Sequence, residues 1–277
     1  MQELLKSIEV QDFPKSEMEV LVITEGTSES AKAIGIRLAK GEVIGILASD
    51  NELFHKTDLT SYYEGALNYG VCIPGYYHWS KEDDSLNRYF ALIGGNDPLS
   101  YYMGKNDKLP YFDIDYSFPF GSSLGDNGYF VKKELIESTD LDNYYHVDNA
   151  NEVSCIGKRY PGMRIWHKTG GNIFSFFRKR YHYGLQHAFN KNRRWNLVDF
   201  KQRKDIIRFI WFIFASLTLV HPLYTSIRGY SKIGDLAWFL HPLICLATLF
   251  TYGCLVIHLC VRGMFQSLFA PMVAQRA

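Results

Sequence analysis

Cysteine pairs of the kind that bind zinc or build a disulfide framework are missing from this sequence. The chain has five cysteines in 277 residues, and none forms a CxxC pair. They are Cys72, Cys155, Cys245, Cys254 and Cys260. The last three lie in an apolar C-terminal part, where small core or lipid-facing residues are the ordinary role of cysteine. We therefore expect neither a disulfide framework nor a zinc site.

Repeats, low-complexity linkers and a signal peptide are missing too. No internal repeat or low-complexity segment interrupts the first 200 residues, so we expect one domain there. The opening residues MQELLKSIEV are charged and amphipathic, which is not the pattern of a secretory signal peptide.

A large net charge is also missing, but the value of +1 hides an uneven distribution. Between Lys158 and Lys204 there are thirteen Lys and Arg residues and one acidic residue, Asp199. The rest of the chain carries 17 basic and 28 acidic residues. A basic segment within an acidic protein points to a polyanion, a phosphate group or a membrane surface as its partner.

Two long uncharged runs are present near the C-terminus. Residues 209–227 contain 19 residues without Asp, Glu, Lys or Arg, and residues 236–261 contain 26. A membrane span needs roughly 20 apolar residues. Both runs contain a His-Pro pair, which a membrane helix tolerates when its neighbours bond the freed carbonyl. We predict two transmembrane helices, with two buried helices of a soluble protein as the alternative.

The flanking charges give the expected orientation. Lys201, Arg203, Lys204 and Arg208 precede the first run, while Arg228 and Lys232 in the connection are partly offset by Asp235. The more basic flank is expected to be cytoplasmic. This places both the preceding domain and the C-terminus in the cytoplasm.

The first part of the chain has the pattern of an α/β domain. Helical spacing of apolar residues predicts helices over residues 2–9, 29–39 and 86–93, and apolar β-branched runs predict buried strands over 18–24, 42–48 and 71–74. The first two strands and the helix between them suit a right-handed βαβ unit. Ligands of such sheets bind at the carboxyl ends of strands. The polar, glycine- and aromatic-rich stretch from Gly94 to Gly128 is expected to form binding loops.

Four segments resemble family 2 glycosyltransferases of the GT-A type. The opening LLKSIEVQDFPKSEMEVLVITEGTSE is similar to the family's first helix, second strand and acidic turn. The next, AKAIGIRLAKGEVIGILASDN, is similar to the helix and strand that lead to the metal-binding Asp-x-Asp. SLGDNGYFVKKELI resembles the segment that closes over the sugar, and YYHVDNANEVSCIGKRYPGMRIWH resembles the catalytic acidic segment and a strand that ends in His.

The resemblance implies a Rossmann-like GT-A domain with a mostly parallel sheet over residues 1–170. An interfacial helical segment over 171–204 and a transmembrane hairpin over 205–277 would follow. It implies inverting transfer of a sugar from a nucleotide-sugar donor to a lipid-linked or membrane-proximal acceptor, as in the synthesis of a cell-envelope polysaccharide or glycolipid. The implied site residues are Asp148 as catalytic base, Glu25, Asp50, Asn127 and Gly128 at the nucleotide sugar, Asp50 at Mg²⁺ or Mn²⁺, and His167 near the diphosphate.

The chain departs from the family pattern at three places. The family's first strand has no counterpart, the first Asp of the Asp-x-Asp pattern is Ala48, and the Gln-x-x-Arg-Trp motif of processive enzymes is missing. Two alternatives therefore stay open. One is a non-catalytic, transferase-like membrane partner protein, and the other is a polyprenyl-phosphate glycosyl synthase, whose acceptor phosphate needs no base. DNA upstream of Met1 that encodes an apolar strand would favour an enzyme.

Taken without the resemblance, the same residues have simpler explanations. Asp50 and Asp148 suit caps of the segments that follow them, Glu25 suits an exposed turn, and His167 suits a structural histidine. A base for the acceptor hydroxyl and a cation for the diphosphate are what sugar transfer requires.

Residues 173–183 interleave aromatic and basic side chains. On a helix in the headgroup region the rings would enter the acyl boundary and the bases would stay in water. Arg178, Lys179 and Arg180 are candidates to bind the phosphate of a lipid-linked acceptor, with plain membrane adhesion as the alternative. Stacking on single-stranded nucleic acid is a third reading, and the apolar runs that follow argue against it.

Overall fold

The structure, a computed structural model, describes residues 1–111, 127–143, 149, 152–153, 158–168, 172–189 and 196–274. Side chains at positions 28, 158–162, 187, 189 and 263–274 lie outside the described part. The predicted base, Asp148, also lies outside it.

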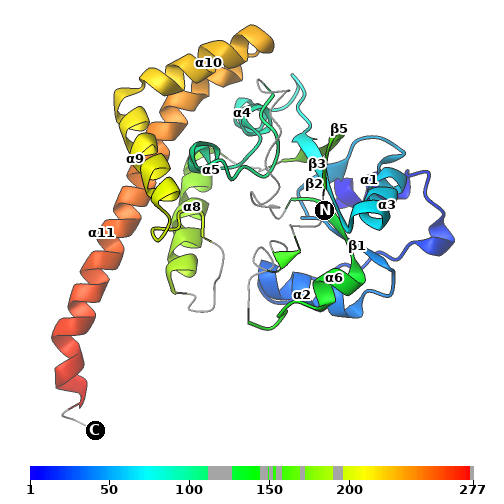
Figure 1. Cartoon of the computed structure of the whole chain (residues 1–277), viewed down its shortest axis with the longest axis horizontal. Helices are drawn as coiled ribbons and strands as arrows, with labels where there is room; N and C mark the ends of the chain where they lie inside the picture. Colours follow the sequence, from blue (N-terminus) through cyan, green and yellow to red (C-terminus); the bar gives the residue numbers. More distant parts are fainter. Residues whose placement is uncertain are drawn as a thin grey trace.

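The described elements alternate between helices and strands in the first half and are helical afterwards (Figure 1). The strands are β1 (Val43–Ile46), β2 (Asn51–Leu53), β3 (Val71–Tyr77), β4 (Tyr129–Lys132) and β5 (Lys158–His167). The helices are α1 (Gln2–Glu9), α2 (Ser28–Leu38), α3 (Asp58–Tyr69), α4 (Ser85–Ile93), α5 (Pro98–Met103), α6 (Lys133–Glu137), α8 (Ile173–Phe189), α9 (Arg203–Thr218), α10 (Val220–Lys232) and α11 (His241–Ala274), with 3-10 turns η1 (Lys15–Glu17) and η2 (Leu236–Leu240).

The five strands form one sheet in the order β1-β4-β3-β5-β2. The pairs β1–β4, β4–β3 and β5–β2 are antiparallel, and only the pair β3–β5 is parallel among the described strands. The expectation of a mostly parallel sheet is therefore wrong for the described residues. A mixed α/β fold is what the structure has.

Several predicted elements are confirmed. The helix predicted over residues 29–39 is α2, which begins with a capping box in which Thr27 and Ser30 bond each other's backbone N–H groups. The strand predicted over residues 42–48 is β1, and the one predicted at residues 71–74 extends to Tyr77 as β3. Helices α1 and α4 also lie where helical spacing placed them.

The strand predicted over residues 18–24 is not formed. This segment belongs to no helix or sheet, and Val20, Leu21 and Val22 are 45%, 40% and 48% exposed. Its apolar pattern is that of a strand buried between two neighbours, and no described strand lies beside it. The right-handed βαβ unit expected from this strand, α2 and β1 is therefore also missing from the described fold.

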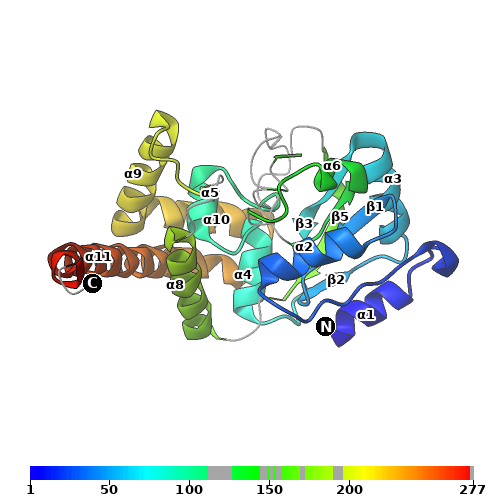
Figure 2. The ribbon, with the colours of Figure 1, turned by 90° about the horizontal axis from the view of Figure 1, so that it is seen from below.

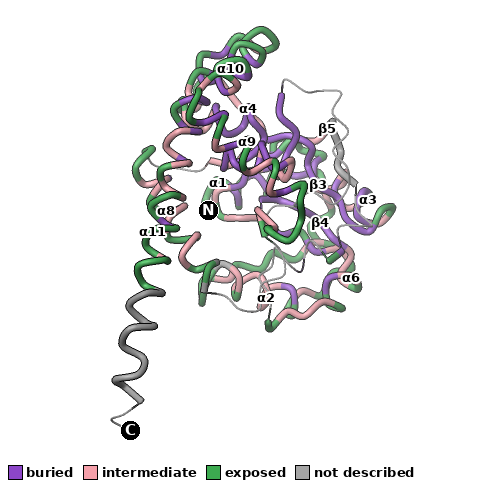
Figure 3. Tube along the Cα trace, turned by 60° about the vertical axis from the view of Figure 1, so that its left-hand side comes forward, coloured by how far each residue is buried: buried purple, intermediate pink, exposed green. Residues whose placement is uncertain are grey.

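The helices α8 to α11, called the helical half, lie on one side of the sheet part, which comprises the five strands and α1 to α6. Helices α8, α9 and α11 stand together, remote from α1, α2 and α3, and α4 and α5 lie between the two groups (Figures 1 and 2). Most strand residues are buried, whereas exposed residues continue along α8, α10 and α11 (Figure 3). The predicted boundaries at residues 170 and 204 fall between β5 and α8 and just inside α9, and they stay predictions.

The first predicted span, residues 209–227, is not one straight helix. Helices α9 and α10 meet at Leu219, whose φ is 59°, and their axes differ by 84°. Within a continuous helix, Pro222 would clash with the carbonyl of Thr218. The break removes this clash because it places Pro222 in the first turn of α10.

The second predicted span is largely α11. The stretch Leu236–Arg262 is long and apolar enough to cross a membrane by length and composition. It is the one straight segment of the described chain with these properties, and the bent pair α9–α10 passes the same test only when taken together.

A buried ion pair fixes the start of the C-terminal helices to α4. The Arg88 Nε and Asp235 Oδ2 atoms are 3.1 Å apart, and the side chains are 18% and 5% exposed. Asp235 also accepts a hydrogen bond from the Ala237 N–H group and so caps η2. Close by, the Tyr89 hydroxyl bonds the His241 Nδ1 atom at 2.8 Å. These contacts join η2 and α11 to the same core that holds α4 on the sheet.

Replacement of Asp235 by alanine tests this attachment. We expect Asp235→Ala to lower the free energy of unfolding by about 3 kcal/mol, because Arg88 stays buried without its carboxylate. Urea unfolding in detergent, followed by tryptophan fluorescence, measures the change. The matched control is Asp142→Ala, which breaks the exposed Arg37–Asp142 pair and should cost less than about 1 kcal/mol. Equal losses in both variants would contradict the assignment.

Candidate functional site

The strand order brings the ends of four strands to one edge of the sheet. Strand β4 runs antiparallel between β1 and β3, so its first residue, Tyr129, pairs with Ile46, the last residue of β1. Strands β3 and β5 are parallel and end at Tyr77 and His167. The residues that follow β1, β3 and β5, and those that precede β4, therefore gather at this edge.

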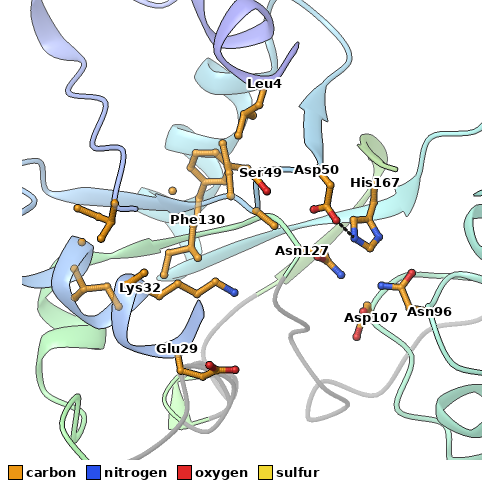
Figure 4. Close-up of a pocket in the computed structure, with 18 of the residues that line it drawn as sticks. Leu4, Glu29, Lys32, Ser49, Asp50, Asn96, Asp107, Asn127, Phe130 and His167 are labelled. Atoms are coloured by element: carbon orange, nitrogen blue, oxygen red, sulfur yellow. Dashed lines mark ion pairs between the residues drawn. The ribbon is translucent and has the colours of Figure 1, made fainter. Parts of the chain in front are cut away.

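Asp50 lies at this edge because the chain crosses the sheet between β1 and β2. The turn is closed by the Asn51 N–H group bonding the Ala48 carbonyl at 2.9 Å, while the Asn51 side-chain oxygen accepts from the Ala48 N–H group. Asn51 pairs with His167 in the sheet. Asp50 is thus placed beside His167, and its Oδ2 atom lies 3.3 Å from His167 Nε2 (Figure 4).

Tyr77 connects this pair to further polar groups. Its ring stacks on the His167 ring with 5.2 Å between centroids. The Tyr77 hydroxyl accepts a hydrogen bond from Asn127 Nδ2 at 2.9 Å and donates one to Asp107 Oδ2 at 3.1 Å. The Lys108 ammonium lies 5.5 Å from the centroid of the same ring. A chain of contacts therefore runs from Asp50 to His167, through a ring stack to Tyr77, and by hydrogen bonds to Asn127 and Asp107.

The backbone next to Asn127 requires a glycine at position 128. Its φ is +72°, a conformation that side chains other than hydrogen disfavour, and a Cβ atom there would lie 2.3 Å from Ile165 Cδ1. Ile165 of β5 thus lies against the backbone just before β4, next to Asn127, which bonds Tyr77. The predicted pair Asn127 and Gly128 is thus part of the site's framework.

Asn96, Asp97 and Asp107 were not singled out by sequence reasoning. They lie in the stretch from Gly94 to Gly128 that was expected to form binding loops, and the polar run Gly-Gly-Asn-Asp after an apolar helix was the available signal. Asn96 and Asp107 face the same space as Asp50 and His167 (Figure 4). The buried Oδ1 atom of Asn96 has no hydrogen-bond partner among the described residues.

Asp97 is a buried carboxylate at the junction of three helices. It caps α5 by accepting from the Leu99 N–H group at 2.8 Å, and it accepts a hydrogen bond from the Tyr252 hydroxyl of α11. Burial raises its pKa, and the nearby Arg180 charge of α8 opposes this only in part. A shifted carboxylate in a cavity wall is a feature of functional sites and also of structural networks.

One cavity of about 1330 Å³ is lined by six of these residues, Asp50, Asn96, Asp97, Asp107, Asn127 and His167. This is larger than the roughly 300–1,000 Å³ of ordinary ligand pockets. Its first wall is apolar and comes from the segment 17–23, α2 and β1, and its far wall comes from α8 and α11. Lys179 and Arg180 stand on the far wall, so basic and acidic groups face the same space.

The structure brings together most, but not all, of the predicted site residues. Asp50, Asn127, His167, Lys179 and Arg180 line the cavity, and Gly128 adjoins it. Glu25 and Arg178 are exposed and are not among the lining residues, although Ile23, Glu29 and Lys179 near them in sequence are. The aromatic rings of α8 were expected to insert into lipid. Phe176 is instead buried against Phe90, so the expectation is wrong for this ring.

The residues present can hold only part of a metal's coordination. Among the described residues, no three His, Cys, Asp or Glu side chains form a group that could bind a metal ion. Asp50 and His167 supply one carboxylate and one imidazole at adjacent positions. Mg²⁺ and Mn²⁺ commonly take few protein ligands and complete their coordination with substrate phosphates and water. The pair therefore fits a divalent ion that is shared with a diphosphate.

The sequence matches no protein-family model and no curated protein.

Substitution of Gly128 tests the framework of the site. We expect Gly128→Ala to lower the free energy of unfolding by about 2–3 kcal/mol, because the backbone conformation is unfavourable for alanine and Ile165 must move. Thermal unfolding measures the effect. Gly234→Ala is the control, since a Cβ atom there meets nothing within 4 Å and should change stability little.

The pH dependence of stability tests Asp97. A carboxyl whose folded pKa is raised destabilises the fold once it ionises, so its unfavourable contribution is present above the folded pKa and vanishes as pH falls to about 3.8. Asp97→Asn should therefore be more stable than the native protein at pH 7, by about 1.4 kcal/mol for each unit of the shift.

Asp205→Asn is the control of opposite sign. Burial works to raise the pKa of Asp205, but hydrogen bonds from Lys105 and the Asp199 N–H group outweigh it, and the pKa is lowered. This variant should lose stability at pH 7. A stability loss in Asp97→Asn at pH 7 would mean that the charge of Asp97 is favourable in the fold.

Proposed function

We propose that the protein is a membrane-attached glycosyltransferase of the family 2, GT-A type, which transfers a sugar with inversion from a nucleotide-sugar donor to a lipid-linked or membrane-proximal acceptor. One observation carries the proposal. Asp50, Asn127 and His167, which the resemblance drew from three distant segments, meet at one sheet edge on one large cavity. Chance similarity of short motifs gives no reason for them to meet.

The two walls of the cavity suit the two substrates. The acidic and amide groups at the sheet edge can orient the hydroxyls of a nucleotide sugar, as bidentate and single hydrogen bonds from buried polar groups commonly do. Lys179 and Arg180 are on the opposite wall, beside the apolar helices. A phosphate carried by a lipid would reach these bases from the membrane side. Glu25 and Arg178 have no part in this arrangement.

A divalent ion would be held by Asp50, with His167 beside it. When bound, Mg²⁺ or Mn²⁺ supplies charge neutralisation for the leaving diphosphate. His167 also fixes the Asp50 carboxylate in place, and its own ring is held by the stack on Tyr77. Asp148 stays the proposed base, by the resemblance alone.

Membrane attachment belongs to the same proposal. The basic flank over residues 201–208, at the start of α9, favours a cytoplasmic position for the sheet part. The hydropathy of the sequence predicts two spans. The bend at Leu219 interrupts the first of these predicted spans.

A specific observation favours the non-catalytic alternative. The outer edge of β1 and the exposed apolar residues Val20, Leu21 and Val22 line the same cavity, and no described strand lies between them. Together with Ala48 in place of an acidic residue, this leaves part of a nucleotide site without protein groups. A transferase-like partner protein that binds a nucleotide without turnover would have this architecture.

Enzyme assays distinguish these functions. Full-length protein in detergent, given nucleotide sugars, Mn²⁺ and a lipid-phosphate acceptor, should release nucleoside diphosphate. Asp50→Asn and His167→Ala should each reduce the rate at least about 100-fold, because each weakens the stabilisation of the leaving diphosphate. Asp142→Asn removes an exposed carboxylate away from the cavity and should leave the rate unchanged.

The variants also separate the alternatives. Loss of activity in Asp148→Asn, by about 100-fold or more, is expected for an acceptor hydroxyl that needs a base. Full activity in that variant with a polyprenyl-phosphate acceptor would point to the polyprenyl-phosphate synthase. Binding of nucleoside diphosphate and Mn²⁺ without any turnover would support the non-catalytic protein. No binding and no turnover would refute the proposal.

A further inference from the structure

The helices α9, α10 and α11 expose their apolar sides and bury their small or polar ones. On α9 and α10 the exposed apolar residues recur at helical spacing, while Ala215, Ser216, Thr225, Ser226 and Gly229 face inward. Fourteen large apolar residues of the three helices are each more than 40% exposed. They are Ile207, Ile210, Trp211, Phe214, Leu217, Val220, Leu223, Tyr224, Ile227, Tyr230, Leu243, Phe250, Val256 and Ile257. Such a face is far beyond what a water-soluble monomer usually exposes.

Both ends of the α9–α10 pair are fastened to the sheet part. At its start, Lys105 Nζ lies 2.7 Å from Asp205 Oδ2, and Arg208 donates to the Met103 carbonyl. The segment that follows Lys105 is bonded to β3 through Leu109. At its end, Asp235 is paired with Arg88 of α4. The chain therefore leaves the sheet part and returns to it on the same side of any membrane.

This return excludes a single crossing by α9–α10. A single crossing would put Asp235 on the far side of the bilayer from Arg88, and the two side chains are in contact. Two crossings would need each helix to span about 30 Å of hydrocarbon. Helix α9 has 16 residues and α10 has 13, which gives lengths of roughly 24 Å and 20 Å at 1.5 Å per residue.

Helix α11 is also fastened along its length. His241 bonds Tyr89 of α4, Tyr252 bonds Asp97 at the start of α5, and His258 bonds Tyr181 of α8. Residues 241–258 therefore lie against α4, α5 and α8 on one side. A perpendicular crossing here would carry Asp97 and the basic α8 into hydrocarbon, where each charge is costly. The remaining helix, residues 259–274, is too short to cross alone.

The exposed charges beside this face are mainly positive. Lys201 precedes α9, Arg203 and Lys204 are its first residues, Arg228 and Lys232 lie on α10, and Arg262 lies on α11. Between residues 196 and 274 the acidic residues are Asp199, Asp205 and Asp235, and the last two are buried in ion pairs. Charge complementarity therefore selects anionic lipid headgroups as neighbours of the apolar face.

We propose that α9, α10 and α11 together form a monotopic lipid-docking face, which lies in one leaflet of an anionic bilayer without crossing it. The polypeptide before α9 and the C-terminus are then on the same side of the membrane, as is the connection between α10 and η2. This inference concerns attachment and does not depend on sugar transfer.

Cysteine labelling in sealed vesicles tests the number of crossings. Lys232→Cys, at the last residue of α10, and Ala277→Cys, at the C-terminus, are placed separately in a background in which Cys254 and Cys260 are alanine. An N-terminal tag cleaved by added protease establishes that residues 1–200 face outward. A membrane-impermeant maleimide should label both cysteines without detergent, to the same extent as Gln202→Cys before α9.

Each other labelling pattern identifies a different arrangement and overturns the proposal. Protection of Lys232→Cys with labelling of Ala277→Cys would indicate two spans. Protection of Ala277→Cys with labelling of Lys232→Cys would indicate one span by α11.

Flotation with vesicles tests the lipid chemistry. Native protein should float with vesicles of equal phosphatidylglycerol and phosphatidylcholine, and a triple change of Lys201, Arg203 and Lys204 to Gln should weaken this about fivefold per charge. Binding to pure phosphatidylcholine should be unchanged by it. The matched control changes three exposed lysines of the sheet part, Lys6, Lys40 and Lys56, to Gln.

The apolar face has its own variant. Trp211→Ser with Phe214→Ser should reduce flotation with both kinds of vesicle. A detergent-free native protein that forms a stable water-soluble dimer and does not float would show that a second copy covers the face, and it would refute the lipid-docking proposal.

Discussion

The architecture depends on the antiparallel insertion of β4 between β1 and β3. This placement turns the start of β4 toward the same sheet edge as the ends of β1, β3 and β5. Backbone hydrogen bonds fix the register, and the absence of a side chain at Gly128, just before β4, leaves room for the Ile165 side chain. The chain of contacts from Asp50 through His167 and Tyr77 to Asn127 follows from this single arrangement. If β4 were instead the outermost strand of the sheet, these side chains would be separated from one another.

Local pattern in the sequence was sufficient to predict α1, α2, α4, β1 and β3, because the spacing of apolar residues and the capping of helices act over a few residues. Local pattern gave a wrong prediction for residues 18–24. A buried strand and an exposed apolar segment have the same pattern in sequence, and they differ only in whether another strand lies beside them. The mixed direction of the sheet was equally invisible to a pattern that is local. The same limit applies to the first predicted span, where a window of composition gives no weight to the position of Pro222. The break at Leu219 is a steric effect at one residue.

The candidate site was predicted in part for a different reason. Asp50, Asn127 and His167 were recognised through motifs that reflect chemistry, and their meeting at one cavity depends on long-range pairing that no local rule contains. Asp97 and Asp107 belong to no motif, and their roles arise from contacts with Tyr252 and Tyr77. The buried Asp97 and the half-buried Asp107 would have been difficult to distinguish from ordinary loop acids in the sequence. Glu25 and Arg178 show the converse, since a motif position and a charge run placed them near a cavity that they do not line.

The outer edge of β1 has a consequence for the behaviour of the protein in solution. Four residues, with Gly45 among them, present backbone N–H and C=O groups to which no described strand is bonded, and the neighbouring segment 20–22 is apolar. Natural sheets usually shield such an edge with charge, proline or a covering helix. At high concentration this edge would promote growth of the sheet from one molecule into the next, through main-chain bonds that are indifferent to sequence. Self-association by this route would be independent of lipid, and detergent would not suppress it.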